Sequence, residues 1–262
     1  MLGTKTKEQV LDLFPENTVL AAYRGSVVHG MYVPNTDPNS IDDIDLMGVF
    51  MAPVGKYIGL DSGKDTIEKF VDEYDTVHYE FKKMVLLLLK SNPNVLSILH
   101  LKPEHYLFTS DVGKILLDNK DCFSSLVAYN AFSGYAYGQL KRMESFVKEG
   151  YMGEKRKSLV MQLGFDAKNG AHCIRLLRMA VEFLETGKLN VFREQDAEEL
   201  LEIKLGKRSL ESIKAEANDL FDKAGRARDK SSLPKEPDFK SVNEMVQQVL
   251  YNYIKVNREN AQ

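Results

Sequence analysis

The spacing of apolar residues changes once along the chain, from short apolar runs to long amphipathic stretches. The short runs are bounded by polar or glycine-containing segments, which is typical of strands. We predict strands at residues 18–24, 43–51, 66–71, 75–79 and 106–109. In the same part of the chain, residues 6–14 and 81–90 have helical spacing, and the Pro93 segment stops the second of these helices and starts another.

Beyond about residue 110 the pattern is almost entirely helical. Long amphipathic stretches cover residues 124–148, 154–185, 195–205, 209–228 and 239–256, separated by glycines at 150, 153, 187 and 206 and by a linker at 233–237. The change of pattern predicts an α+β fold. We expect a small mixed β-sheet domain with flanking helices at residues 1–110, followed by an all-helical domain at residues 111–262.

Composition excludes some classes of protein. At 44% hydrophobic and 28% charged residues the chain is typical of a soluble protein, and its net charge of −3 argues against a basic surface over the whole molecule. Cys122, Cys173 and the scattered histidines have no zinc-ligand spacing, so we expect reduced thiols. The apolar run at residues 85–89 is far shorter than the roughly 20 residues of a membrane span, and the N-terminus does not resemble a signal peptide. We therefore expect a cytoplasmic protein without membrane contact.

Candidate chemistry is concentrated in residues 23–50. Gly25 and Ser26 follow a short apolar run, where Gly25 would make a sharp turn and Ser26 would cap a helix. Asp43 and Asp45 are two positions apart at the start of the next predicted strand, so their carboxylates can point to the same side. Two carboxylates that close repel each other unless a cation neutralises them, and hard oxygen ligands suit Mg²⁺ or Mn²⁺.

Neither half of this pattern is informative alone. A Gly-Ser pair occurs in many turns, and an Asp-x-Asp pair is most often a solvated strand end. Together they place backbone N–H donors at the start of a helix beside a site for divalent cations. Such an arrangement binds the phosphates of a nucleotide, because helix N-termini attract anions and metal ions bridge phosphate oxygens.

The segments Gly25-Ser26-Val27-Val28-His29-Gly30 and Asp42-Asp43-Ile44-Asp45-Leu46-Met47-Gly48-Val49 resemble the signature of the DNA polymerase β-like nucleotidyltransferases. The chain is most similar to the predicted nucleotidyltransferase branch that is associated with RNA ligases. The resemblance continues through Tyr79, residues 92–94, residues 168–178 and residues 233–234, and so covers most of the chain. The 17 positions from Ser26 to Asp43 are more than is usual in the superfamily. The excess lies in residues 36–41, within the loop at residues 33–42, which is either a surface turn or a lid.

The resemblance implies a nucleotidyltransferase that moves a nucleoside monophosphate from an NTP to an acceptor hydroxyl with release of pyrophosphate. It implies two Mg²⁺ or Mn²⁺ ions held by Asp43 and Asp45, with Gly25 and Ser26 at the β and γ phosphates. It also implies a third carboxylate that helps deprotonate the acceptor. Asp75 is the first choice for this role, and Glu80 is the second, although a structural acid at a helix N-terminus is the favoured explanation of Glu80.

Other residues are candidates for the nucleotide. Lys168, His172 and Arg175 lie at i, i+4 and i+7, which is one stripe of a helix, and a stripe facing the cleft would bind triphosphate or acceptor. An exposed charged face is the alternative explanation. His29 would contact phosphate or cap a helix. The segment containing Tyr135, Tyr137 and Gln139 would contact a base or pack in the core.

The acceptor is not fixed by the residues. The family association favours the end of an RNA or tRNA, with a protein or a small molecule as alternatives. A non-catalytic nucleotide-sensing or RNA-binding module is a further hypothesis, although the acidic residues at 43, 45 and 75 count against it.

Overall fold

The computed structural model describes residues 2–37, 40–144 and 153–259. The strands in these ranges are β1 (Thr18–Tyr23), β2 (Ile44–Phe50), β3 (Thr66–Val71), β4 (Tyr74–Glu80) and β5 (Tyr106–Thr109). The α-helices are α1 (Lys7–Leu11), α2 (Gly25–Val28), α3 (Val54–Ile58), α4 (Phe81–Leu89), α5 (Pro93–Leu96), α6 (Asp111–Asp118), α7 (Val127–Glu144), α8 (Glu154–Leu163), α9 (Ala167–Thr186), α10 (Ala197–Lys204), α11 (Leu210–Lys230) and α12 (Phe239–Glu259). Short 3₁₀ turns lie at Ser97–His100, Pro103–His105 and Lys120–Phe123.

The five strands form one mixed sheet in the order β3-β4-β2-β1-β5. Strand β2 pairs in parallel with β4 and antiparallel with β1, while β3 and β5 form the two edges through antiparallel pairing. Central strands buried on both faces are expected to be continuously apolar, and β1 and β2 fit this, since most of their residues are buried. The predicted α+β fold with a mixed sheet and C-terminal helices is confirmed.

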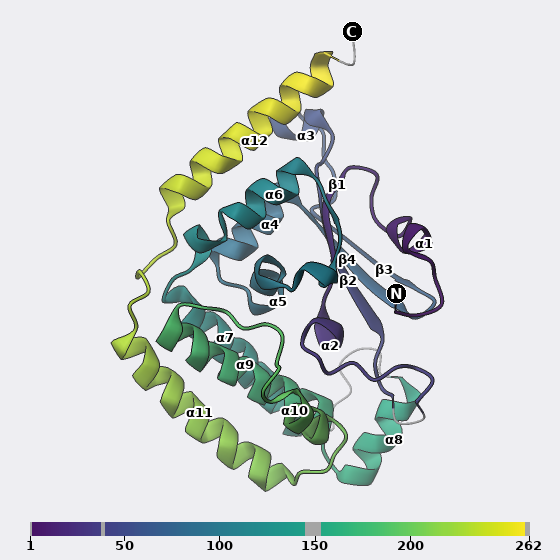
Figure 1. Cartoon of the computed structure of the whole chain (residues 1–262), viewed down its shortest axis with the longest axis vertical. Helices are drawn as coiled ribbons and strands as arrows, with labels where there is room; N and C mark the ends of the chain where they lie inside the picture. The colour runs from purple at the N-terminus through teal and green to yellow at the C-terminus, as the bar shows by residue number, and fades with distance from the viewer. Residues whose placement is uncertain (1, 38–39, 145–152, 260–262) are drawn as a thin grey trace.

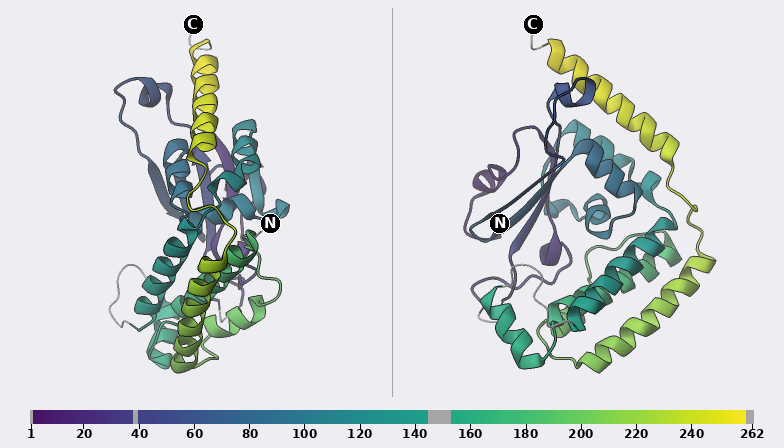
Figure 2. Two further views of the ribbon diagram at one scale, coloured as in Figure 1. Left: turned by 90° about the vertical axis from the view of Figure 1, so that its left-hand side faces the viewer. Right: turned by 180° about the vertical axis from the view of Figure 1, so that it is seen from behind.

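The helices are unequally divided between the two faces of the sheet (Figures 1 and 2). Helix α1 lies on one face, where a capping box between Thr6 and Gln9 fixes its start. The other face carries α4, α5 and α6, and beyond one end of the sheet α7, α9, α10 and α11 pack together. Helix α9 is the centre of this group, with most of its residues buried. None of the helices described is both long and apolar enough to cross a membrane.

Three local predictions were wrong. The amphipathic stretch at residues 154–185 is two helices, because Gly164 ends α8 in the left-handed conformation (φ +79°) and Asp166 caps α9 by accepting from the backbone N–H of Asn169. Ser26 is not a helix cap, since α2 begins one residue earlier with Arg24 as its N-cap. Strand β2 begins at Ile44, so Asp43 precedes it. The end of the helix predicted at 124–148 lies outside the described residues.

A buried ion pair ties the start of β2 to the helical part. The side chain of Lys204, at the end of α10, is fully buried and donates to Asp42 Oδ2 and to the carbonyl oxygen of Met31 at 2.8 Å. Asp42 Oδ2 also accepts from the backbone N–H of Val33 at 3.0 Å. Lys168 of α9 completes the cluster, at 3.4 Å from Asp42 Oδ1. The loop at residues 33–42 is therefore anchored at its two ends by one buried carboxylate.

We expect Lys204→Met to lower the free energy of unfolding by about 3–5 kcal/mol, because the change leaves Asp42 buried without its closest positive charge. Urea denaturation measures the loss. The double variant Lys204→Met/Asp42→Asn should recover part of it, since no unpaired charge then remains in the interior. Lys207→Met is the matched control, because Lys207 pairs with Glu202 at an exposed position, where a pair contributes about 0–1 kcal/mol. Equal losses in Lys204→Met and Lys207→Met would contradict this account.

Candidate active site

The turn between β1 and α2 lies directly against an acid of β2. Gly25 has φ +63°, in the left-handed region, and a Cβ at this position would collide with the carboxylate of Asp45. The preceding residue, Arg24, donates its backbone N–H to the carbonyl oxygen of Asp45 at 2.9 Å. Glycine is therefore required at position 25 by both its backbone conformation and the close approach of the carboxylate.

Three aspartates gather at this end of the sheet. Asp45 pairs in register with Asp75 across the parallel strands β2 and β4, and Asp43 is exposed just before β2. Burial raises the pKa of Asp45, Arg24 lowers it, and the charges of Asp75 and Asp43 raise it further. Although the residue is exposed, partial desolvation of its carboxylate also raises the pKa of Asp43, with Lys168 lowering it and Asp75 raising it. The three carboxylates are close enough to repel one another.

Arg24 partly neutralises these acids. Its Nη2 atom lies 3.4 Å from Asp45 Oδ1 and 3.1 Å from Asp75 Oδ2. With these two carboxylates directed at a guanidinium, no three His, Cys, Asp or Glu side chains in the described part of the chain are grouped so as to hold a metal ion. No sequence pattern selects Arg24, which lies between the end of β1 and Gly25.

Glu80, the second choice for the third carboxylate, has a different environment. It lies at the opposite end of β4 from Asp75, in register with Phe50. Its carboxylate caps α4 by accepting from the backbone N–H groups of Lys82 and Lys83, and Tyr57 donates to it at 2.6 Å. These bonds account for the buried acid as a structural cap, away from Asp43 and Asp45.

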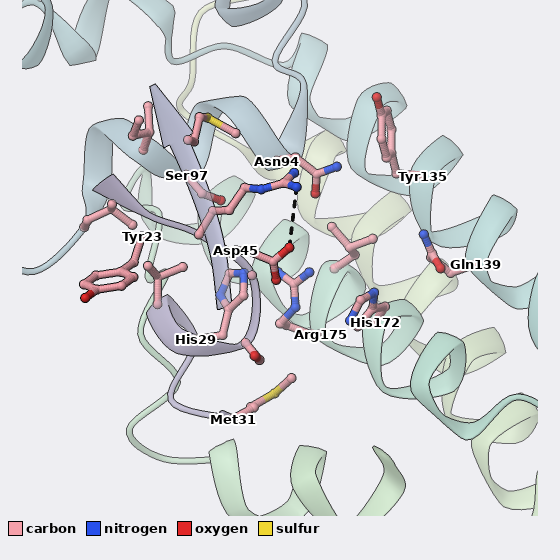
Figure 3. Close-up of a pocket in the computed structure, with 18 residues that line it drawn as sticks. Tyr23, His29, Met31, Asp45, Asn94, Ser97, Tyr135, Gln139, His172 and Arg175 are labelled. Atoms are coloured by element: carbon pink, nitrogen blue, oxygen red, sulfur yellow. Dashed lines mark ion pairs between the residues drawn. The ribbon is translucent and has the colours of Figure 1, made fainter. Parts of the chain in front are cut away.

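A pocket of about 170 Å³ opens beside Asp45, between the β1–α2 turn and helices α7 and α9 (Figure 3). Asp45 and His29 lie on the sheet side of the pocket, and Tyr135, Gln139 and His172 lie on the helical side. Six of the residues selected from the sequence for catalysis or nucleotide binding line it: Gly25, Ser26, His29, Asp45, His172 and Arg175. Tyr135 and Gln139 also line it, together with Asn94, which belongs to the segment 92–94 of the family resemblance, and Ser97, which the sequence did not single out.

Arg175 is the unusual charge of this pocket. It is buried, its Nε atom has no hydrogen-bond partner, and Nη1 contacts only the sulfur of Met179 at 3.3 Å. No carboxylate within the described ranges pairs with it. Burial lowers the pKa of Arg175 to about 9, and the charge of Arg193 lowers it as well. A buried charge without a counterion is costly, so the site is suited to an anion that enters the pocket.

Arg178, one turn further along α9, has the opposite environment. It forms ion pairs with Asp196, Glu199 and Glu216 at 2.5–2.9 Å. These acids accept hydrogen bonds from all three nitrogens of its guanidinium. The two arginines therefore have different roles, although they look alike in the sequence.

The polar groups around Arg175 are neutral donors and acceptors. The hydroxyl of Ser26 is buried without a partner among the described residues. His29 donates Nδ1–H to the carbonyl oxygen of Val191 at 2.8 Å, which leaves Nε2 as an acceptor in the neutral ring. Burial and the charge of Arg175 lower the pKa of both His29 and His172. Both rings are therefore neutral at pH 7, and Arg175 supplies the positive charge.

Lys168 is separated from the rest of its predicted stripe. Its Nζ donates to the carbonyl oxygen of Ile41 at 3.0 Å and lies near Asp42. It lines a second hollow together with Asp43, outside the pocket that holds His172 and Arg175. Tyr137 is exposed and does not line the pocket either.

Comparisons with known proteins follow this geometry. A nucleotidyltransferase-like protein from Exiguobacterium sibiricum is similar at 10% sequence identity and a TM-score of 0.31, over 86% of this chain and 73% of that one. No curated protein matches the chain. The model of the RNA repair pathway DNA polymerase beta family matches residues 3–248. This match covers nearly the whole sequence and confirms the resemblance carried by residues 25–30 and 42–49, so the chain belongs to the RNA repair pathway DNA polymerase beta family.

Proposed function

We propose that the protein is a metal-dependent nucleotidyltransferase that moves a nucleoside monophosphate from an NTP to an acceptor hydroxyl, with an RNA end as the acceptor. The observation that carries the proposal is the pocket in which the unpaired Arg175 and the unpartnered hydroxyl of Ser26 stand beside Asp45. A triphosphate supplies the negative charge and the acceptor oxygens that these groups lack. Membership of the family supports the same class of reaction.

The donor chemistry at the acids fits a divalent cation. Asp43 and Asp45 offer hard carboxylate oxygens, and their pKa values are raised by burial first and by the nearby charge of Asp75 as well. Mg²⁺ or Mn²⁺ would stabilise both carboxylates in their ionised form. The cation would compete with Arg24 for Asp45. When bound, it would neutralise phosphate oxygens as charge develops on them. Asp43 and Asp45 are the residues proposed to hold two such ions, with Asp75 as the third carboxylate.

The remaining groups bind and orient the substrates. In the proposed reaction the acceptor oxygen forms a bond to the α-phosphorus, the bond from that phosphorus to the bridging oxygen breaks, and pyrophosphate leaves with the electron pair. The acceptor proton passes to the carboxylate of Asp75, which is half exposed and held by Arg24. Ser26 and Arg175 hold the β and γ phosphates, and the neutral rings of His29 and His172 supply hydrogen bonds.

One observation favours a second candidate function. Arg24 already neutralises Asp45 and Asp75. This arrangement is expected of a module that binds a nucleotide without catalysing its transfer. Incubation with each labelled NTP, Mg²⁺, RNA and cell extract separates the two functions. Release of pyrophosphate with label entering RNA supports the transferase, while NTP binding without release supports the binding module. Label that enters protein or a small molecule would support the transferase but would replace RNA as the proposed acceptor.

We expect Asp43→Asn and Asp45→Asn each to reduce transfer by more than about 10³-fold, because several kcal/mol of charge stabilisation at the phosphates is lost. Labelled NTP and a stopped-time gel assay measure the rate, and circular dichroism should show an intact fold. Asp72→Asn is the control, since Asp72 is an exposed carboxylate in the turn between β3 and β4 that pairs with Lys5. Retained transfer in both variants would exclude the proposed roles.

We expect Arg175→Met to raise KM for the NTP by about 10–100-fold, which corresponds to the loss of one charged hydrogen bond. The same change should leave Tm unchanged or raise it, because a buried unpaired charge is removed. Steady-state kinetics and thermal melting measure the two effects.

The matched control is Arg178→Met. It should lower Tm, since Asp196 and Glu216 lose their partner, without changing KM for the NTP. An unchanged KM in Arg175→Met combined with a lowered Tm would show that Arg175 is structural.

A further inference from the structure

Two hollows flank the cluster of acids. Asp45 lines the pocket that contains Arg175. Asp43 lines a second, more open hollow of about 370 Å³, here called the outer groove, whose other walls include Phe70, Lys155, Arg156 and Lys168. In the proposed transfer, the acceptor and the leaving pyrophosphate lie on opposite sides of the reacting phosphorus. The enclosed pocket suits a triphosphate, and the open groove suits a substrate that continues into solvent.

Phe70 is placed beside the acids by the pairing of three strands. On the edge strand β3 it lies opposite Asp75 of β4, which in turn lies opposite Asp45 of β2. Paired residues on neighbouring strands point to the same face of a sheet, so the ring belongs to the same row as the two carboxylates. The side chain is 61% exposed. A large apolar side chain at this position is not explained by packing.

Basic side chains line the same groove. Lys155, in the first turn of α8, is exposed. Arg156 is held by Asp166 through two hydrogen bonds of 2.6 and 3.3 Å, and Lys168 is held by the carbonyl oxygen of Ile41. Two of the three positive charges are therefore fixed in position, and each lies beside an acid, Asp166 for Arg156 and Asp42 for Lys168. Lys155 is the exposed positive charge of the groove, whose lining also includes Glu154. An exposed aromatic ring together with basic groups is the combination that binds single-stranded nucleic acid, by stacking of a base and by attraction of phosphates.

We propose that the outer groove receives the unpaired terminal nucleotide of an acceptor RNA strand, whose base stacks on Phe70 and whose hydroxyl is directed toward Asp43 and Asp75. The proposal rests on the proposed function and specifies its acceptor. Stacking on a ring requires a base that is free of its own partner. The groove therefore selects single-stranded ends over flush duplex ends.

Binding without turnover tests the groove separately from the chemistry. A fluorescently labelled single-stranded oligoribonucleotide is titrated with the protein in the absence of NTP, and anisotropy gives Kd. Phe70→Ala should weaken binding by about tenfold or more, as expected for the loss of one base–aromatic stack, and Phe70→Trp should restore it. Phe108→Ala is the matched control, because Phe108 is an exposed aromatic on β5, the opposite edge of the same sheet, and its loss should leave Kd unchanged.

Transfer kinetics supply the second measurement. Phe70→Ala should raise KM for the RNA and leave KM for the NTP unchanged, and a flush duplex should be the poorer acceptor. Three results would each overturn the groove proposal. They are an equal Kd for Phe70→Ala and the unaltered protein, equal use of flush duplex and single strand as acceptors, and label that enters protein instead of RNA. Retained transfer in Asp43→Asn and Asp45→Asn would instead overturn the proposed function, while the anisotropy titration would still decide on Phe70.

Discussion

The buried pair of Asp42 and Lys204 is the interaction on which the geometry of the site depends. Its carboxylate belongs to the residue just before Asp43, and its amine ends α10, which packs on α9. The pair therefore fixes the start of β2 relative to the helix that carries His172 and Arg175. Lys168 of α9 adds a second connection at the same carboxylate. Without these charges, the start of β2 would lose its direct ionic connection to α9 and α10.

Arginine side chains in this protein differ in whether a carboxylate pairs with them, and the two arginines that line the pocket, Arg24 and Arg175, differ in this way as well. Arg156, Arg178 and Arg193 each have at least one acidic partner within 3 Å. Arg175 has none in the described structure, although it is buried to a similar degree as Arg193. Since a fold gains nothing from burying an isolated guanidinium, the environment of Arg175 supports the proposal that it holds an anionic ligand. The same reasoning applies to the buried hydroxyl of Ser26.

The sequence predicted the fold class because the apolar pattern of each strand and helix is local. It also selected Gly25, Ser26 and Asp45, whose spacing reflects one turn and one strand. It could not predict that Lys168 bonds to Ile41 instead of facing the pocket, because that contact joins residues 127 positions apart. Arg24 and Phe70 were missed for the same reason. Their importance comes from strand pairing, which places both beside Asp75, and no short-range pattern records which strands become neighbours.

Arg24 also explains how three carboxylates can lie close together when no metal cation is bound to them. Asp45 and Asp75 are adjacent in register, a position where like charges destabilise a sheet. The guanidinium offsets this repulsion by contacting both acids. Asp43 contributes less to the repulsion because it is exposed, and solvent screens its charge. A divalent cation would carry twice the charge of Arg24 and would replace it electrostatically at Asp45. The fold therefore tolerates the acids before a substrate arrives, and the strand pairing that forces them together is also the pairing that brings Phe70 into their row.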